Sequence, residues 1–302
     1  MRTSIVPLVA AAAMAVVAGS NHAAKADEAS RVVMVIDGFQ SPESVLIAGD
    51  RRFVSNIGKV LDPLAKDGDG YISEVSADGK LVKARAFPAA GETLDAPKGM
   101  AAIDGRLYVA DIDRIVGFDL TSGARVFEQR VPGDRPALAN DLAATADGRL
   151  LVTDSLRNAV YRLDPKDGAW TELAAGLPGA NGVVVEPRHQ RIVVAGIGEN
   201  FSGGDVFAID GSAKPARLDG APRGLFDGLA ALPDGRLLVS DWKAVDRPTA
   251  GAILILSADG VPVGEIETGQ DIHGPADFAL DRDMLWVPAM LDNKVIVIRM
   301  AE

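Results

Sequence analysis

The sequence predicts an all-β protein that folds as a single six-bladed β-propeller, with its N-terminal strand closing the last blade. Two observations lead to this prediction. A short motif recurs six times along the chain, and each copy is followed by short apolar stretches that turn signals separate. No segment has the long hydrophobic period of an amphipathic helix, which argues against folds that alternate strands and helices.

Each repeat opens with a four-residue motif whose second position is usually polar. The six copies are Pro42-Glu43-Ser44-Val45, Pro97-Lys98-Gly99-Met100, Ala139-Asn140-Asp141-Leu142, Ala180-Asn181-Gly182-Val183, Phe226-Asp227-Gly228-Leu229 and Pro275-Ala276-Asp277-Phe278. Their second residues lie at positions 43, 98, 140, 181, 227 and 276, so the intervals are 55, 42, 41, 46 and 49 residues. Periods of about 40 to 50 residues with four short strands per unit are typical of propeller blades.

Within a repeat, the motif begins a first strand that runs into a turn such as Asp147-Gly148. Asp-Gly between two apolar runs is a strong hairpin signal, because glycine supplies the positive φ that a tight turn requires. A second apolar strand follows and ends in a small or acidic residue. These second strands include residues 107–111, 150–154 and 237–241. A third strand, such as residues 159–163, and in most repeats a fourth, such as residues 170–173, complete the unit.

The two ends of the repeat array predict how the ring closes. The sixth repeat ends with the apolar strand 294–298 and has no fourth strand, whereas the apolar strand 32–36 precedes the first repeat and belongs to none. We expect strand 32–36 to lie at the outer edge of the last blade, where it covers an edge that would otherwise be unpaired. No long linker divides the chain, so residues 27–302 are expected to form one domain.

The first 26 residues have the pattern of an export signal. Arg2 is followed by an apolar run at residues 5–18, and Ala24 and Ala26 occupy the positions that a signal peptidase reads. The apolar run is short for a membrane span, so we favour a signal peptide at residues 1–26 over a membrane anchor. The mature protein is then expected to be periplasmic or secreted, with no membrane attachment.

Composition excludes several classes of function. The chain carries 31 basic and 42 acidic residues, a net charge of −11, which argues against nucleic acid or an anionic membrane as a partner. It contains no cysteine, so disulfides, thiolate metal sites and cysteine nucleophiles are excluded. With three histidines in the whole chain, a site built mainly from imidazole groups is not expected.

The repeat places a ring of side chains at the centre of the predicted propeller. The first strand of each blade lines the channel, so the second motif residues should face one another: Glu43, Lys98, Asn140, Asn181, Asp227 and Ala276. Two carboxylates and two amides supply oxygen ligands, which suit calcium, with magnesium or manganese as alternatives. A different interpretation stays open, because Asp or Asn before Gly is also ordinary turn chemistry.

At these residues the chain resembles the SMP-30/gluconolactonase/LRE-like family of six-bladed propellers, from about Gly38 to Ile298. Members of that family hold a divalent metal with a Glu in the first blade, two Asn in the third and fourth, and an Asp in the fifth. The resemblance therefore implies a metal bound by Glu43, Asn140, Asn181 and Asp227. Sugar-lactone enzymes of the family carry an Arg two residues before the third-blade Asn. This chain has Leu138 there, which argues against aldonolactone specificity.

The leading hypothesis is metal-dependent hydrolysis of a small-molecule lactone or related ester. A cation in the channel would polarise the carbonyl group and orient it toward water. Asp227, as ligand or base, is the candidate for activating that water. Lys98 could hold a substrate carboxylate or stabilise an oxyanion, and its alternative role is a salt bridge to Glu43, Asp111 or Asp141.

Two further features lie near the predicted channel. His273 is three residues before the sixth-blade position, so it is a candidate general base at the channel mouth, and the alternative is a loop histidine without a role. Residues 62–70 form an insertion in the first repeat that contains Asp67-Gly68-Asp69-Gly70. It lacks the bidentate glutamate of a calcium-binding loop, so we interpret it as a mobile loop near the channel and a candidate lid.

The competing hypothesis is a non-catalytic periplasmic propeller that binds a ligand or a protein and holds a structural metal. Propellers often present loops to partners, and a fold does not determine a function. Leu138 and Lys98 favour this alternative, because both depart from the pattern of the sugar-lactone enzymes.

Overall fold

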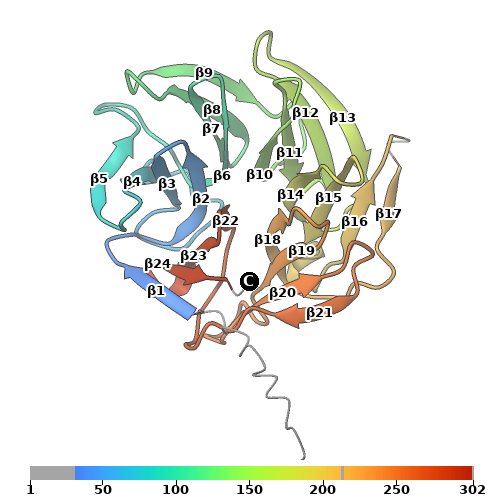
Figure 1. Cartoon of the computed structure of the whole chain (residues 1–302). Coiled ribbons are helices and arrows are strands. Elements are labelled where there is room, and N and C mark those ends of the chain that lie inside the picture. The colour runs from blue at the N-terminus through green and yellow to red at the C-terminus, as the bar shows by residue number, and fades with distance from the viewer. Residues whose placement is uncertain (1–30, 212–213, 301–302) are drawn as a thin grey trace, which may run out of the picture.

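The computed structural model describes residues 31–211 and 214–300, and it confirms the six-bladed β-propeller. Six four-stranded antiparallel sheets are arranged around a central channel (Figure 1). Two short 3-10 turns, η1 (Glu199–Phe201) and η2 (Met290–Asp292), lie between strands. Within the described ranges no helix has the length and apolar character needed to cross a bilayer. The expected signal peptide, residues 1–26, falls outside the described residues.

In the first five blades the innermost strand comes first in the chain and the strands follow outward in order. Blade 1 consists of β2 (Pro42–Ala48), β3 (Arg51–Asn56), β4 (Tyr71–Val75) and β5 (Leu81–Phe87). Blade 2 consists of β6 (Pro97–Ile103), β7 (Arg106–Asp111), β8 (Arg114–Asp119) and β9 (Arg125–Arg130). Blade 3 consists of β10 (Ala139–Ala144), β11 (Leu150–Asp154), β12 (Ala159–Asp164) and β13 (Ala169–Ala175).

The last three blades include the sixth, in which the ring is closed. Blade 4 consists of β14 (Ala180–Glu186), β15 (Arg191–Gly196), β16 (Val206–Ile209) and β17 (Pro215–Arg217). Blade 5 consists of β18 (Phe226–Ala231), β19 (Leu237–Asp241), β20 (Ala252–Leu256) and β21 (Pro262–Glu265). Blade 6 consists of β22 (Ala279–Asp281), β23 (Met284–Ala289), β24 (Lys294–Arg299) and β1 (Arg31–Ile36). The N-terminal strand thus forms the outer edge of the last blade, which confirms the predicted closure (Figure 1).

The first five inner strands share one irregularity at the motif. In blade 3, for example, Ala139 pairs with Asp154 and the next pair is Leu142 with Val152, so β10 carries one extra residue. The same shift occurs at the corresponding place in β2, β6, β14 and β18. An extra residue of this kind is a β-bulge, which releases residues from the ladder and re-aims their side chains. Each bulge contains the second residue of the motif.

The glycines in the motif serve contacts between blades, so the turn interpretation of Asn-Gly and Asp-Gly at these positions is wrong. An added Cβ at Gly182 would lie 2.2 Å from the backbone oxygen of Asp227 in the next blade. At Gly228 it would lie 2.8 Å from the backbone oxygen of Ala276. Neither glycine has a positive φ, in contrast to Gly148, whose φ of 80° fits the predicted hairpin turn.

Apolar clusters fill the spaces between adjacent blades. Tyr108 of blade 2 packs in one cluster with Leu150 of blade 3, and Trp286 of blade 6 packs in another with Val54 of blade 1. A further cluster collects residues from blades 1, 2, 5 and 6 beside the channel: Ile57, Ala96, Ile112, Trp242, Ala276 and Met290. Since these side chains are buried, the channel residues next to them are largely removed from water.

A glycine substitution tests the close approach of the blades. We expect Gly182→Ala to lower the free energy of unfolding by about 1–3 kcal/mol, because the new methyl group overlaps the backbone of blade 5. Chemical denaturation measures the change.

Gly264→Ala in β21 is the matched control, since its added Cβ meets a side-chain atom at 3.6 Å and its φ is not positive. It should change the free energy of unfolding by less than about 0.5 kcal/mol. Equal stabilities of the two variants would contradict the account.

Candidate functional site

A cavity of about 380 Å³ lies where the motif residues meet loops that join the second and third strands of the blades. Glu43, Lys98, Asn140, Asn181 and Asp227 all line it, so the structure brings together five of the six predicted channel positions. Five blades also contribute apolar loop residues, namely Leu61, Leu156, Phe201, Val245 and Met290. Pro63 of the first-blade insertion also lines the cavity, so the insertion lies at the channel, as its position in the repeat predicts.

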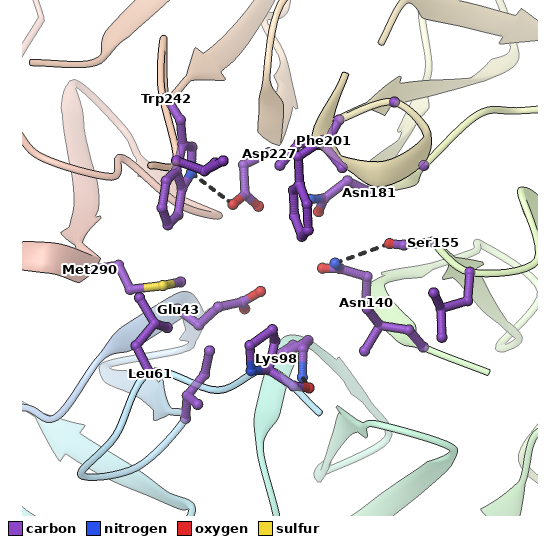
Figure 2. Close-up of a pocket in the computed structure, with 18 of the residues that line it drawn as sticks. Glu43, Leu61, Lys98, Asn140, Ser155, Asn181, Phe201, Asp227, Trp242 and Met290 are labelled. Carbon is purple, nitrogen blue, oxygen red and sulfur yellow. Dashed lines mark hydrogen bonds between the residues drawn. The ribbon is translucent and has the colours of Figure 1, made fainter. Parts of the chain in front are cut away.

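The four predicted ligand side chains point toward a shared space (Figure 2). Glu43, Asn140, Asn181 and Asp227 are each at most 8% exposed. Each comes from a different blade, and each sits in the β-bulge that begins an inner strand. Closure of the ring is what makes these residues neighbours, since they are widely separated in sequence.

Three of these side chains carry a buried oxygen that accepts no hydrogen bond within the described part of the chain: Glu43 Oε2, Asn181 Oδ1 and Asp227 Oδ1. A buried polar atom without a partner costs about 1–3 kcal/mol, and more when it is charged. Three such atoms around one space are therefore expected to be satisfied by something other than the protein.

Neighbouring side chains fix the orientation of two candidate ligands. The indole Nε1 of Trp242 donates to Asp227 Oδ2 at 2.9 Å, which leaves Oδ1 to face the cavity. The amide Nδ2 of Asn140 donates to Ser155 Oγ at 3.1 Å, and that hydroxyl donates to the backbone oxygen of Ala180 at 2.7 Å. Because the Asn140 nitrogen is engaged, its oxygen is the atom available to the cavity (Figure 2).

Lys98 lies at the same cavity but does not form any of the expected salt bridges to Glu43, Asp111 or Asp141. Its ammonium group donates to the backbone oxygens of Ala96 at 2.7 Å and Pro63 at 2.9 Å. The second bond ties the first-blade insertion to the inner strand of blade 2. Two of its three N–H donors are thus committed to the backbone, which leaves one for a ligand.

His273 is outside the group that lines the cavity. Its ring Nδ1 is 2.9 Å from Asp292 Oδ1, and its backbone nitrogen donates to Asp292 Oδ2 at 3.1 Å. These contacts hold the loop before blade 6 against η2. A role as general base is therefore not supported by its position, and a loop residue with a structural contact describes it better.

The buried charges disturb one another's ionisation. Burial, and next the negative charge of Asp227, raise the pKa of Glu43 well above its ordinary value. Burial, and next the charge of Asp277, raise the pKa of Asp227 to about 8. Burial lowers the pKa of Lys98, and the charge of Glu43 opposes that shift. The site holds more negative charge than its buried setting favours, a condition that a cation would relieve.

The donor set fits a hard divalent cation. Unpartnered oxygens from two carboxylates and an amide converge with the Asn140 amide, and calcium and magnesium prefer oxygen ligands. Among the described residues, no group of three or more His, Cys, Asp or Glu could hold a metal ion. A cation in this cavity would therefore depend on the two asparagine oxygens as well as the two carboxylates.

A second layer of residues, which sequence reasoning missed, supports the bulges. In three blades a hydroxyl from the second strand accepts a hydrogen bond from the third motif residue, whose amide the bulge has freed. The pairs are Ser44 N to Ser55 Oγ at 2.9 Å, Asp141 N to Thr153 Oγ1 at 2.8 Å, and Gly228 N to Ser240 Oγ at 2.7 Å. Buried amides are almost always paired, so these hydroxyls stabilise the bulged conformation.

The residue after each hydroxyl orders the segment that leads into the inner strand. The contacts are Gln40 N to Asn56 Oδ1 at 3.0 Å, Leu138 N to Asp154 Oδ1 at 3.0 Å, and Leu225 N to Asp241 Oδ1 at 3.1 Å. The signal for this layer was present in the repeat, because the second strands end in Ser-Asn, Thr-Asp and Ser-Asp in these blades.

Solved structures share the fold along nearly the whole chain. A protein assigned as a gluconolactonase has a TM-score of 0.63 and 15% sequence identity, over 90% of this chain and 93% of its own. A catalytically inactive virginiamycin B lyase from Staphylococcus aureus, solved with quinupristin, has a TM-score of 0.59 and 15% identity, over 88% and 98%. Hydrazine synthase of Kuenenia stuttgartiensis has a TM-score of 0.58 and 17% identity, over 87% and 77%.

No family model matches the sequence, and no curated protein matches it. Identities of 15–17% show a common fold and leave the chemistry open. The fold implied by the resemblance to the SMP-30/gluconolactonase/LRE-like family is thus confirmed, while membership of that family stays a prediction.

The raised carboxylate pKa values predict how stability depends on pH. The pKa of Asp227 is about 8 in the folded protein and near 4 in an unfolded chain, so folded Asp227 binds its proton more tightly. The unfolded state then carries fewer protons between pH 4 and 8, and the free energy of unfolding falls as pH rises through that window. With a chelator present, we expect a lower melting temperature at pH 8 than at pH 5.5.

Calcium should reduce this difference, because the cation binds the deprotonated carboxylates of the folded state. Differential scanning calorimetry at both pH values, with chelator or with excess calcium, measures the effect. Asp227→Asn is the control, and it should reduce the pH dependence without abolishing it, because burial also raises the pKa of Asp277, to about 7. A melting temperature that rises from pH 5.5 to 8 in chelator would contradict the assignment.

Proposed function

We propose that this protein is a metal-dependent hydrolase that acts on a lactone or related ester. The observation that carries the proposal is the group of three buried, unpartnered oxygens that face one apolar cavity. The name of one similar propeller, a gluconolactonase, is consistent with this class of reaction. We further propose that the mature protein works in the periplasm or outside the cell, on a small molecule.

The proposed ligands of a divalent cation, most simply calcium, are Glu43, Asn140, Asn181 and Asp227. When bound there, the cation supplies an electrophile that polarises an ester carbonyl. The protein's own contribution is to hold four oxygens in fixed orientations, through Trp242 for Asp227 and through Ser155 for Asn140. Apolar loop residues around the cavity reduce access of bulk water and so strengthen electrostatic interactions within it.

In the proposed reaction a water oxygen forms a bond to the ester carbonyl carbon, and the bond from that carbon to the alcohol oxygen breaks. Asp227 Oδ1, the oxygen that Trp242 leaves free, has two lone pairs, so it could hold the cation with one and accept the proton of the attacking water with the other. Asp227 then passes this proton to the departing oxygen. The remaining N–H of Lys98 can donate to the carbonyl oxygen as negative charge develops on it. His273 has no part in this scheme.

The second candidate is a propeller that binds an apolar ligand without converting it and uses the cation for stability. One observation favours it: two of the three Lys98 donors are bound to the backbone, so the one basic side chain among the described residues of the cavity wall is largely engaged. An assay of ester hydrolysis separates the two candidates, since a protein that binds a ligand without hydrolysing it supports the second.

The proposed chemistry predicts that activity depends on the cation and on Asp227. Hydrolysis of a panel of lactones and aryl esters at pH 8 should be lost after dialysis against a chelator and restored by calcium. Asp227→Asn should lower kcat/KM at least about a hundredfold, since positioned proton transfer typically contributes that much.

The control is Glu265→Gln, which changes an exposed carboxylate on β21 and should leave kcat/KM unchanged. Metal content measured by mass spectrometry on each protein separates loss of the cation from loss of the base. Full activity of the metal-free protein or of Asp227→Asn would exclude the proposed mechanism.

A further inference from the structure

The wall of the cavity remains apolar from the candidate ligands to the protein surface. Four residues that line the cavity are also exposed: Leu61 at 39%, Val245 at 42%, Leu156 at 49% and Phe201 at 52%. They come from the loops of blades 1, 5, 3 and 4, and they surround one opening. A single exposed apolar residue needs no explanation, but a group of four around the mouth of a cavity is characteristic of a binding site.

Deeper residues continue this wall toward the unpartnered oxygens. Leu138 is 7% exposed, Ile197 is also buried, and both line the cavity together with Ile57 and Met290. Leu138 stands directly before the blade that provides Asn140, so an apolar surface lies beside the candidate ligands. A ligand whose carbonyl group reaches a cation held by those oxygens must therefore place its other atoms against aliphatic and aromatic side chains (Figure 2).

Besides the candidate ligands, the described polar side chains that line the cavity are those of Ser155, Lys98 and the exposed Asn200, so the cavity offers few donors or acceptors for a polyhydroxylated ligand. The Ser155 hydroxyl already accepts from Asn140 and donates to the backbone oxygen of Ala180. The Lys98 ammonium has one N–H left. A sugar ring would bury several hydroxyl groups against apolar walls, and each buried hydroxyl without a partner costs free energy.

We propose that the substrate is an uncharged ester or lactone that carries an apolar substituent of several carbons. The carbonyl group lies beside the cation site formed by Glu43, Asn140, Asn181 and Asp227. The substituent extends from there past Leu138 to the mouth of the cavity, where it contacts Leu156, Val245 and Phe201. This inference rests on the proposed hydrolytic function for the reaction but on the cavity wall for the substrate class. Leu156 and Val245 are then residues that determine specificity.

The Lys98 bond to the Pro63 backbone oxygen contributes to the same wall. Leu61 and Pro63 both line the cavity; Pro63 belongs to the first-blade insertion, and Leu61 lies directly before it. The ammonium group holds this segment beside the opening, so the insertion supplies one apolar side of the path that the substituent follows.

The kinetic test uses γ-lactones that share one ring and differ in the length of an alkyl side chain, from γ-valerolactone to γ-decalactone, with glucono-δ-lactone for comparison. We expect kcat/KM to rise with chain length by about two- to fourfold for each methylene group buried. Glucono-δ-lactone should be the poorest substrate, because the cavity has too few free polar groups to pair with its hydroxyl groups.

The binding test uses the matching γ-lactams with the calcium-loaded wild-type protein, since lactams resist hydrolysis and report affinity without turnover. Isothermal titration calorimetry should show the same gain in affinity with chain length. The double variant Leu156→Ser/Val245→Ser should weaken the longest lactam about tenfold and leave the shortest unchanged. Val263→Ser, which changes an exposed valine on the outermost strand of blade 5, β21, is the control and should change neither.

Each pattern of results decides both proposals. If lactams bind more tightly with chain length but no lactone is hydrolysed, the ligand class stands and the hydrolytic function is overturned. If lactones are hydrolysed without dependence on chain length, or glucono-δ-lactone is preferred, the apolar substrate class is overturned and the hydrolytic function stands. If neither chain-length dependence nor hydrolysis is found, both proposals are overturned.

Discussion

The β-bulge at the start of each of the first five inner strands is the constraint on which the rest of the site depends. One extra residue in β2, β6, β10, β14 and β18 removes the second motif residue from the ladder. Ring closure then brings five such residues to one cavity. Hydroxyl groups on the second strands hold three of the bulges, and glycines in the motif allow the neighbouring blades to approach. Without the bulge, strand alternation alone would not place these side chains together.

Burial of two carboxylates in one site is expected to lower the stability of the folded protein. Glu43 and Asp227 are buried within one cavity with unpartnered oxygens. Beyond burial, the charge of Asp227 raises the pKa of Glu43, and the charge of Asp277 raises the pKa of Asp227. Clusters of this kind are rarely retained for stability, because buried like charges disfavour the folded state. Their burial with unpartnered oxygens is the physical reason for a cation in the proposed function, because a cation would offset the repulsion between the carboxylates. The same reasoning accounts for the use of two amides, which add oxygens without adding charge.

Much of the fold followed from the repeat. The intervals between motif copies indicated the number of blades, and the orphan strand at residues 32–36 indicated how the ring closes. The ring positions also followed, because equivalent residues of a cyclic repeat must face one axis. Other features depend on three-dimensional detail that no spacing reveals: the backbone oxygens that hold Lys98, the Trp242 bond to Asp227, and the pairing of His273 with Asp292 away from the cavity. The role of the motif glycines could not be decided from the sequence either, because a close approach between blades leaves the same sequence pattern as a turn.

The central claim is that Glu43, Asn140, Asn181 and Asp227 bind one divalent cation, and anomalous diffraction tests it most directly. Crystals grown with manganese should show a single strong anomalous peak in the channel, within about 2.5 Å of an oxygen from each of the four side chains. Glu43→Gln/Asp227→Asn crystals treated in the same way should lack the peak. A wild-type channel without an anomalous peak, or with the cation bound by other residues, would contradict the account.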